Sequence, residues 1–129
     1  MILQAAEWIY GELSTDAGVI AALDGGAGVV LIFPNDFETL PVLTYAVSQS
    51  VSLQDFWDNT SMANDVSVVL DIYTANEGNT TPIMEAVDAV MSRLLFTLEF
   101  SQPLGDESSR TQHLNMRYSR LGVLQEDVA

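Results

Sequence analysis

The stretch DVSVVLDIYT, residues 65–74, decides the fold class of this 129-residue chain. Apolar residues occupy every second position from Val66 to Ile72, and the residues between them are Ser67, Val69 and Asp71. This period of two is typical of a β-strand that buries one face, because successive side chains of a strand point to opposite sides of the sheet. Such a strand favours an antiparallel or mixed sheet whose second face is solvated or meets a partner.

Four further segments show strand patterns on either side of this stretch. They are expected at residues 29–33, 42–50, 97–100 and 111–121. In the last segment, Leu114, Met116 and Tyr118 are expected to face inward, because they alternate with polar residues. Residues 51–64 show no regular period, so they are expected to form the long loop of an extended hairpin between the flanking strands.

Helical periodicity appears in three places. Residues 2–14 carry apolar side chains at helical spacing, and Asp16 can cap a second short helix. A third helix is expected to have Thr81 as its N-cap and Pro82 at its first position, where the missing proline N–H has no consequence. This helix should continue to about Phe96, with an apolar stripe that includes Leu95.

These elements together predict an α+β fold in a single domain over residues 1–129. The prediction is a mixed, mainly antiparallel sheet of about four strands with two to three helices packed on one face and a long hairpin loop. Residues 125–129 are expected to fray.

The charge balance excludes several classes of function. Eighteen acidic residues stand against four arginines, one histidine and no lysine, which gives a formal net charge of -14. Non-specific binding of nucleic acid needs clustered basic side chains to neutralise phosphates, and the chain carries no basic residue before Arg93.

The absence of cysteine excludes disulfides, thiolate nucleophiles and cysteine zinc sites. No apolar run approaches the ~20 residues that span a bilayer, and no signal peptide is present, so a soluble protein made in the cytoplasm is expected.

No set of residues indicates catalysis, a cofactor or a bound metal. His113 is the only imidazole, and a surface or subunit-contact role is favoured over a place in a Ser-His-Asp triad. Asp65 and Asp71 share a strand face but lie about 20 Å apart at strand rise, too far to act as a glycosidase pair. The glycine-rich run at residues 24–28 follows a helix and precedes a strand, which is the reverse of a phosphate-binding loop. The chain is therefore expected not to be an enzyme.

Taken in order, the elements resemble those of a known family. The segments that carry the likeness are GVVLIFP (28–34), PVLTYAV (41–47), VSVVLDIYTA (66–75), PIMEAVDAVMSRLL (82–95) and HLNMRYSRL (113–121). In pattern and order this sequence resembles the tail completion or tail terminator proteins of long-tailed bacteriophages and prophages, over nearly the whole chain.

The resemblance implies a small α/β domain that assembles as a ring, typically a hexamer, at the head-proximal end of the tail tube in the virion. Such a ring stops polymerisation of the tail tube protein and offers the surface to which the head attaches through a head-closure or connector protein. DNA passes through its lumen without specific binding, and an acidic wall suits that passage because it repels phosphates. The resemblance carries no catalytic residues.

Two groups of residues are candidates for contacts between subunits or with the tail tube. Phe56 and Trp57, in the middle of the long loop, either anchor a neighbour or fold back onto their own domain. Arg110, Arg117 and Arg120 either pair with the acidic surface of an adjacent subunit or are ordinary surface arginines.

Other functions stay open on the sequence alone. The nearest is another head–tail connection component, such as a head-closure or adaptor ring. An acidic DNA-mimic inhibitor would instead be a monomer or dimer with carboxylates in a double-helical array. A hydrolase that uses Asp or Glu alone is the third alternative.

Overall fold

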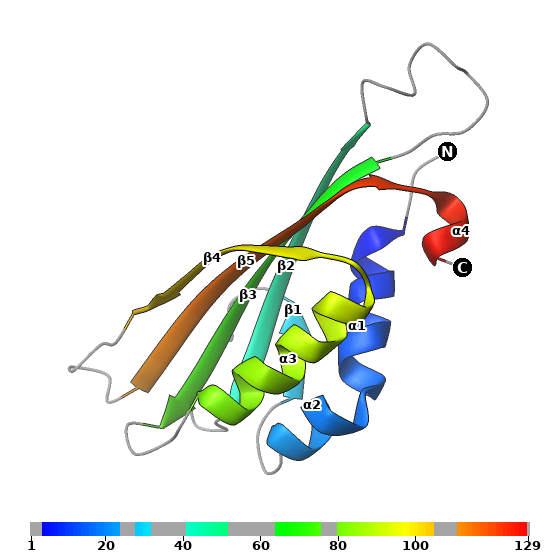
Figure 1. Cartoon of the computed structure of the whole chain (residues 1–129). Coiled ribbons are helices and arrows are strands. Elements are labelled where there is room, and N and C mark those ends of the chain that lie inside the picture. The colour runs from blue at the N-terminus through cyan, green and yellow to red at the C-terminus, as the bar shows by residue number, and fades with distance from the viewer. Residues whose placement is uncertain are drawn as a thin grey trace.

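Strand β3 (Asn64–Ala75) lies at the centre of one mixed sheet (Figure 1). The computed structural model describes residues 4–23, 28–31, 41–51, 64–75, 80–104 and 111–128. Within these residues the sheet has five strands in the order β1-β2-β3-β5-β4, one more than the predicted number of about four. The other strands are β1 (Gly28–Leu31), β2 (Val42–Val51), β4 (Thr97–Pro103) and β5 (Thr111–Val123). β1 runs parallel to β2 and the other pairs are antiparallel, so the predicted α+β class with a mixed, mainly antiparallel sheet is confirmed.

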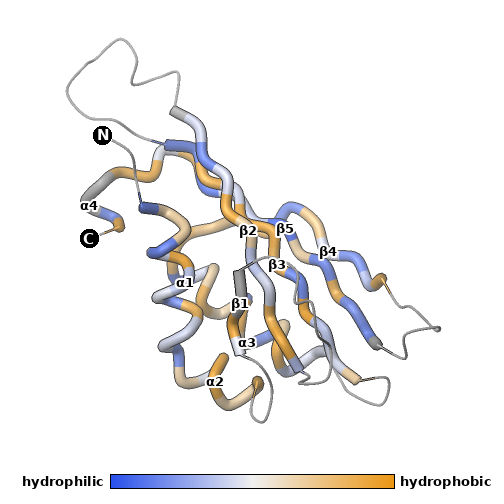
Figure 2. The backbone as a smooth tube through the Cα atoms, turned by 180° about the vertical axis from the view of Figure 1, so that it is seen from behind, coloured by the Kyte–Doolittle hydropathy of each residue, from blue (hydrophilic) through white to orange (hydrophobic). Residues whose placement is uncertain are grey.

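Three helices cover one face of the sheet, as predicted. They are α1 (Ala5–Thr15), α2 (Ala17–Ala22) and α3 (Thr81–Arg93). Both views place them on the same side of the strands (Figures 1 and 2). Asp16 caps α2, because its Oδ2 accepts a 3.1 Å hydrogen bond from the Val19 amide. This confirms the short second helix and its predicted start.

The two faces of the sheet differ in the way that the alternation predicted. On the helix-covered face, Tyr45, Leu70 and Met116 share one row across three strands and are buried. The opposite face, which we call the open face, carries His113, Asn115, Arg117 and Ser119 of β5 with their strand neighbours, and no helix of the described chain lies on it. Polar segments run along β4 and β5 in Figure 2. The core therefore lies between the sheet and α1–α3.

Strands β2 and β3 form the predicted long hairpin. Their ladder runs without a break from Val42 opposite Tyr73 to Val51 opposite Asn64. The connecting residues, which include Phe56 and Trp57, lie outside the described residues.

The ends of α3 differ from the prediction. The helix begins at Thr81 and its N-cap position is Thr80, so the predicted N-cap is one residue too late. Leu95 does not belong to the apolar stripe: it is 69% exposed and has a φ of 67°. The Phe96 amide donates to the Met91 carbonyl at 2.9 Å, which is the backbone pattern of a helix that ends on a left-handed residue.

Two segments near the C-terminus are more regular than predicted. β4 continues past Phe100 to Pro103, because an edge strand tolerates a proline on its unpaired side. Residues 125–128 form the short helix α4 (Gln125–Val128) where fraying was expected. The Leu124 amide donates to Asp127 Oδ2 at 2.8 Å, so a carboxylate of the helix satisfies an amide at its start.

Candidate functional site

Two side chains at the β4–β5 side of the open face form a surface that we call the open-face patch: Phe100 and Arg117. Phe100 lies directly opposite Arg117 in the ladder. Phe100 is 45% exposed, and Arg117 is exposed as well. The patch therefore presents a cation beside a large apolar ring, a composition that is common at protein interfaces.

A β-bulge places Phe100 on this face. Leu98 pairs with Tyr118 on the helix-covered face, whereas Phe100 pairs with Arg117 on the open face. Residues two apart in a regular strand share one face, so the extra residue Glu99 is what separates these two side chains. Sequence alternation alone put Leu98 and Phe100 together and gave no sign of the bulge.

The arginines of the described chain differ in what they contact. Arg93 lies 3.0 Å from Glu12 Oε2 and 3.9 Å from Asp16 Oδ1, which ties α3 to the α1–α2 corner. Arg120 lies 3.3 Å from Asp127 Oδ2 and donates to the carbonyl oxygen of Leu94 at 3.0 Å.

Arg117 is exposed and forms no ion pair with any residue that the structure describes. Of the two predicted interface arginines that the structure describes, Arg117 and Arg120, it is Arg117 whose charge is available to a partner. Arg120 is held within the subunit by the two contacts above, and Arg110 lies outside the described residues. An interface role for these three residues stays a prediction.

A polar cluster occupies the same face on strands β3 and β5: Asp71, Tyr73, His113 and Asn115. Asp71 Oδ1 lies 2.6 Å from His113 Nε2 and accepts a 2.8 Å hydrogen bond from Asn115 Nδ2. The His113 ring stacks on Tyr73, with 4.3 Å between ring centroids. Burial, and then the Asp71 charge, raise the pKa of Tyr73.

This cluster links neighbouring strands and lacks the parts of a hydrolytic site. A Ser-His-Asp triad needs a hydroxyl on the second ring nitrogen, and no such hydrogen bond reaches His113 from the described residues. Asp65 has a separate role, since its Oδ1 accepts from the Gly122 amide at 3.1 Å. The alternating pattern of residues 111–121 predicts His113 on the outward face, but it gives no sign of the pairing with Asp71. The register of β3 against β5 brings the two side chains together, and no local pattern in the sequence specifies that register.

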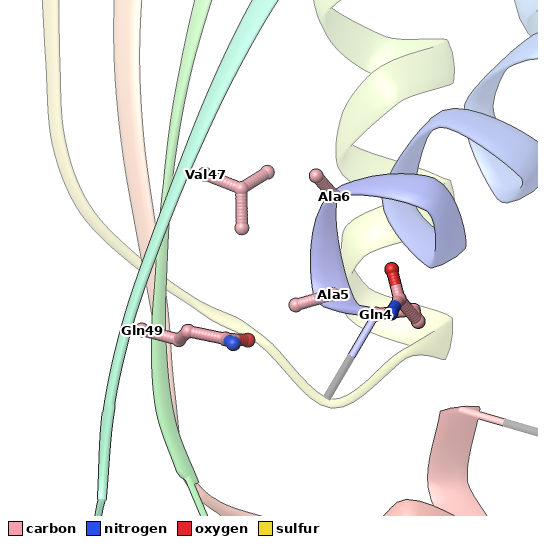
Figure 3. A pocket seen from close by; sticks show the side chains of 5 residues that line it. All are labelled: Gln4, Ala5, Ala6, Val47 and Gln49. Atoms are coloured by element: carbon pink, nitrogen blue, oxygen red, sulfur yellow. The ribbon is translucent and has the colours of Figure 1, made fainter. Parts of the chain in front are cut away.

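A cavity of about 180 Å³ lies between the start of α1 and strand β2 (Figure 3). Its lining residues are Gln4, Ala5, Ala6, Val47 and Gln49. None of these side chains titrates near neutral pH, so the cavity offers no acid, base or nucleophile. The part of the chain that the structure describes also contains no group of three or more metal-ligating side chains. Within the same residues, no helix is long and apolar enough to cross a membrane.

Comparison with known proteins gives a likeness of fold. No protein-family model matches this sequence, and no curated protein is significantly similar to it. Among solved structures, the chain is similar to a chain from the virion of a native gene transfer agent particle, with a TM-score of 0.61 and 15% sequence identity. The match covers 90% of this chain and 91% of that chain. The two proteins therefore share their fold over almost their full lengths.

Proposed function

We propose that this protein is a structural component of a phage-type virion, and within it a tail completion or terminator protein. In this role it forms a ring, typically of six copies, at the head-proximal end of the tail tube. The observation that carries the proposal is the fold shared over 90% of the chain with a protein of a gene transfer agent virion. The order of strands and helices that resembles the tail terminator family supports the more specific role.

The ring acts by covering surfaces. One rim caps the last ring of tail tube protein, so that no further subunit adds. The other rim offers the docking surface for a head-closure or connector protein. Neither task needs a reacting group, and the residues that line the cavity offer none.

The charge of the chain suits the passage of DNA through the lumen. Exposed carboxylates of Glu7, Glu85 and Glu99 have no hydrogen bond or ion pair within the described residues. With a net charge of -14, the wall of the ring repels phosphates, so DNA slides through without specific binding.

The same likeness to a virion protein supports a second candidate, a head-closure or adaptor ring of the head–tail connection. A DNA-mimic inhibitor is less well supported, because many carboxylates have internal partners. Those acids are Glu12, Asp16, Asp65, Asp71, Asp88 and Asp127. Carboxylates that are held by their own chain do not form a free array that imitates phosphates.

Two experiments test the proposal. Electron microscopy of the purified full-length protein should show annular particles. Removal of the gene from its phage or prophage should give headless tails of uncontrolled length, because nothing then stops polymerisation of the tube. Tails of normal length that fail to join heads would support the head-closure or adaptor role instead. Normal infectious particles would contradict both roles.

A further inference from the structure

The open-face patch has the features of an interface. The neighbouring edge strand β4 disfavours a second contact mode, the addition of a partner's strand to the sheet. β4 is the edge strand beside it, and its side chains are exposed along its whole length. A bulge at Glu99 and a proline at position 103 interrupt this edge. Bulges, charges and prolines are the features that prevent strand-to-strand addition at sheet edges. A partner is therefore expected on the face of the sheet, where Phe100 and Arg117 lie.

A complementary surface exists on the opposite layer of the same molecule. Along α1, Glu7, Tyr10 and Ser14 are spaced by three and four residues. Tyr10 lies on the flank of the helix, where one side of its ring meets Tyr45 of β2 with 5.8 Å between ring centroids. Glu7 is exposed, and Tyr10 is 44% exposed. We call this surface the α1 outer row. It presents an acid beside an aromatic ring, whereas the open-face patch presents a cation beside an aromatic ring.

The other free acid of the helical layer is a poorer match. Glu85 on α3 is exposed, but its neighbours one turn away are Thr81, Pro82, Asp88 and Ala89, which offer no large exposed apolar side chain. Aromatic side chains at an interface contribute most of the buried apolar area. The α1 outer row supplies both the charge and the ring that the open-face patch needs.

The two surfaces lie on different layers of the fold, so a contact between them joins unlike faces. α1 packs over β1 and β2, whereas the open-face patch lies near β4 on the reverse side of the sheet (Figures 1 and 2). Contacts between unlike faces repeat from copy to copy and generate closed rings when the rotation closes. Each copy would then add a helix layer to the open sheet face of its neighbour.

We propose that the open-face patch of one copy binds the α1 outer row of a second copy, with Arg117 paired to Glu7 and Phe100 packed on Tyr10. This contact rests on the proposed function as a ring and names the surfaces that build it. The charge balance favours a second copy as the occupant, because Arg117 meets an acid there in a chain with few bases. Opposite charges at an interface set the register of the two partners.

A charge-exchange series in the full-length chain tests the contact. Wild type, Arg117→Glu, Glu7→Arg and the double variant are compared by sedimentation velocity and native mass spectrometry from micromolar to millimolar concentration. Each single variant should weaken assembly by about ten-fold or more, since it places like charges together. The double variant should recover to within about three-fold of wild type. The control, Arg117→Glu with Glu85→Arg, has the same net charge as the rescued variant and should stay weak.

The outcomes separate this contact from the ring itself. A wild-type chain that stays monomeric throughout contradicts the ring and the contact together. A wild-type ring that Arg117→Glu leaves intact contradicts only the contact, and so does equal rescue by Glu85→Arg. Circular dichroism confirms that each variant is folded. Arg117→Gln, which removes the charge without reversing it, should weaken assembly less than Arg117→Glu and serves if the latter does not fold.

Discussion

The phenol of Tyr118 donates a 2.7 Å hydrogen bond to Asp88 Oδ1 and so joins strand β5 to helix α3. Tyr118 is 1% exposed and lies on the helix-covered face. The hydrogen bond lets the hydroxyl of a fully buried tyrosine keep a partner after it leaves water.

Removal of this hydroxyl should destabilise the fold. Tyr118→Phe leaves the packing nearly unchanged but leaves the half-buried Asp88 carboxylate without its donor. The free energy of unfolding should fall by about 1–3 kcal/mol, measured by urea denaturation with tryptophan fluorescence. Tyr10→Phe is the control, since Tyr10 is exposed, and should change it by less than about 0.5 kcal/mol. Equal effects in the two variants would contradict a stabilising role for this hydrogen bond.

The same pair predicts how stability depends on pH. Burial, and then the hydrogen bond to Asp88 and its charge, raise the pKa of Tyr118 well above 10.0. Above pH 10 the unfolded chain loses this proton and the folded chain keeps it, so the folded state binds more protons and stability falls as pH rises. The slope from this group is at most about 1.4 kcal/mol per pH unit.

Tyr118→Phe isolates this contribution. Burial also raises the pKa of Tyr45 and Tyr73, but both remain in the variant. Urea denaturation between pH 8 and pH 11 should therefore show a steeper fall above pH 10 for wild type than for Tyr118→Phe. Parallel curves would show that Tyr118 ionises equally in the folded and unfolded states.

The centre of the sheet should be the most sensitive part of the core. Leu70 is 0% exposed and lies between Tyr45 and Met116 in one row of the helix-covered face. Leu70→Ala should reduce the free energy of unfolding by about 2–5 kcal/mol, because it leaves a cavity. Ile20→Ala is the control, since Ile20 is 55% exposed on α2, and should stay within about 0.5 kcal/mol of wild type. Similar losses would contradict the assignment of the core to this face.

The Asp71 carboxylate should stabilise the open face of the sheet. Asp71→Ala removes the acceptor of both His113 and Asn115, and the free energy of unfolding should fall by about 1–3 kcal/mol. Asp65→Ala removes an acceptor from one exposed backbone amide and should have a smaller effect. Nuclear magnetic resonance gives a second measurement, because the His113 ring protons should lose the ring-current shift of Tyr73 if the stack separates. A shift that survives in Asp71→Ala would mean that stacking alone orients the imidazole.

Local patterns in the sequence predicted the strands and their faces well. Val66, Val68, Leu70 and Ile72 occupy every second position of their segment, and all four are buried. Side-chain direction in a strand depends on local geometry alone, so one segment is enough to predict it. The Asp16 cap of α2 was also predictable, because it joins two residues that are only three positions apart in the chain.

Partners that lie far apart in the chain could not be predicted in this way. Asp71 and His113 are 42 residues apart and meet only because β5 pairs with β3 rather than with β4 alone. The open-face patch depends on the bulge at Glu99, which is a property of the β4–β5 pairing and leaves no periodic signal. By its spacing in the sequence, Leu95 fits the apolar stripe of α3. The helix ends at Arg93, however, and Leu95 has a left-handed backbone conformation, so its side chain does not lie on that stripe.

Replacing two glycines by alanine should change the stability of the fold in opposite directions. Gly122 has a φ of 68°, where a Cβ atom is unfavourable, although nothing lies within 4 Å of the Cβ position. Gly122→Ala should therefore destabilise the fold by about 1–2 kcal/mol through backbone strain alone. Gly11 lies inside α1 with the same open space around its Cβ position, and Gly11→Ala should stabilise the fold by about 0.5–1 kcal/mol. Gly122 lies where the register of β5 against β3 shifts, between the pairs Arg120–Val66 and Val123–Asn64. Thermal denaturation of the two variants checks both signs, and a stabilising Gly122→Ala would show that β5 does not need a left-handed residue at this shift.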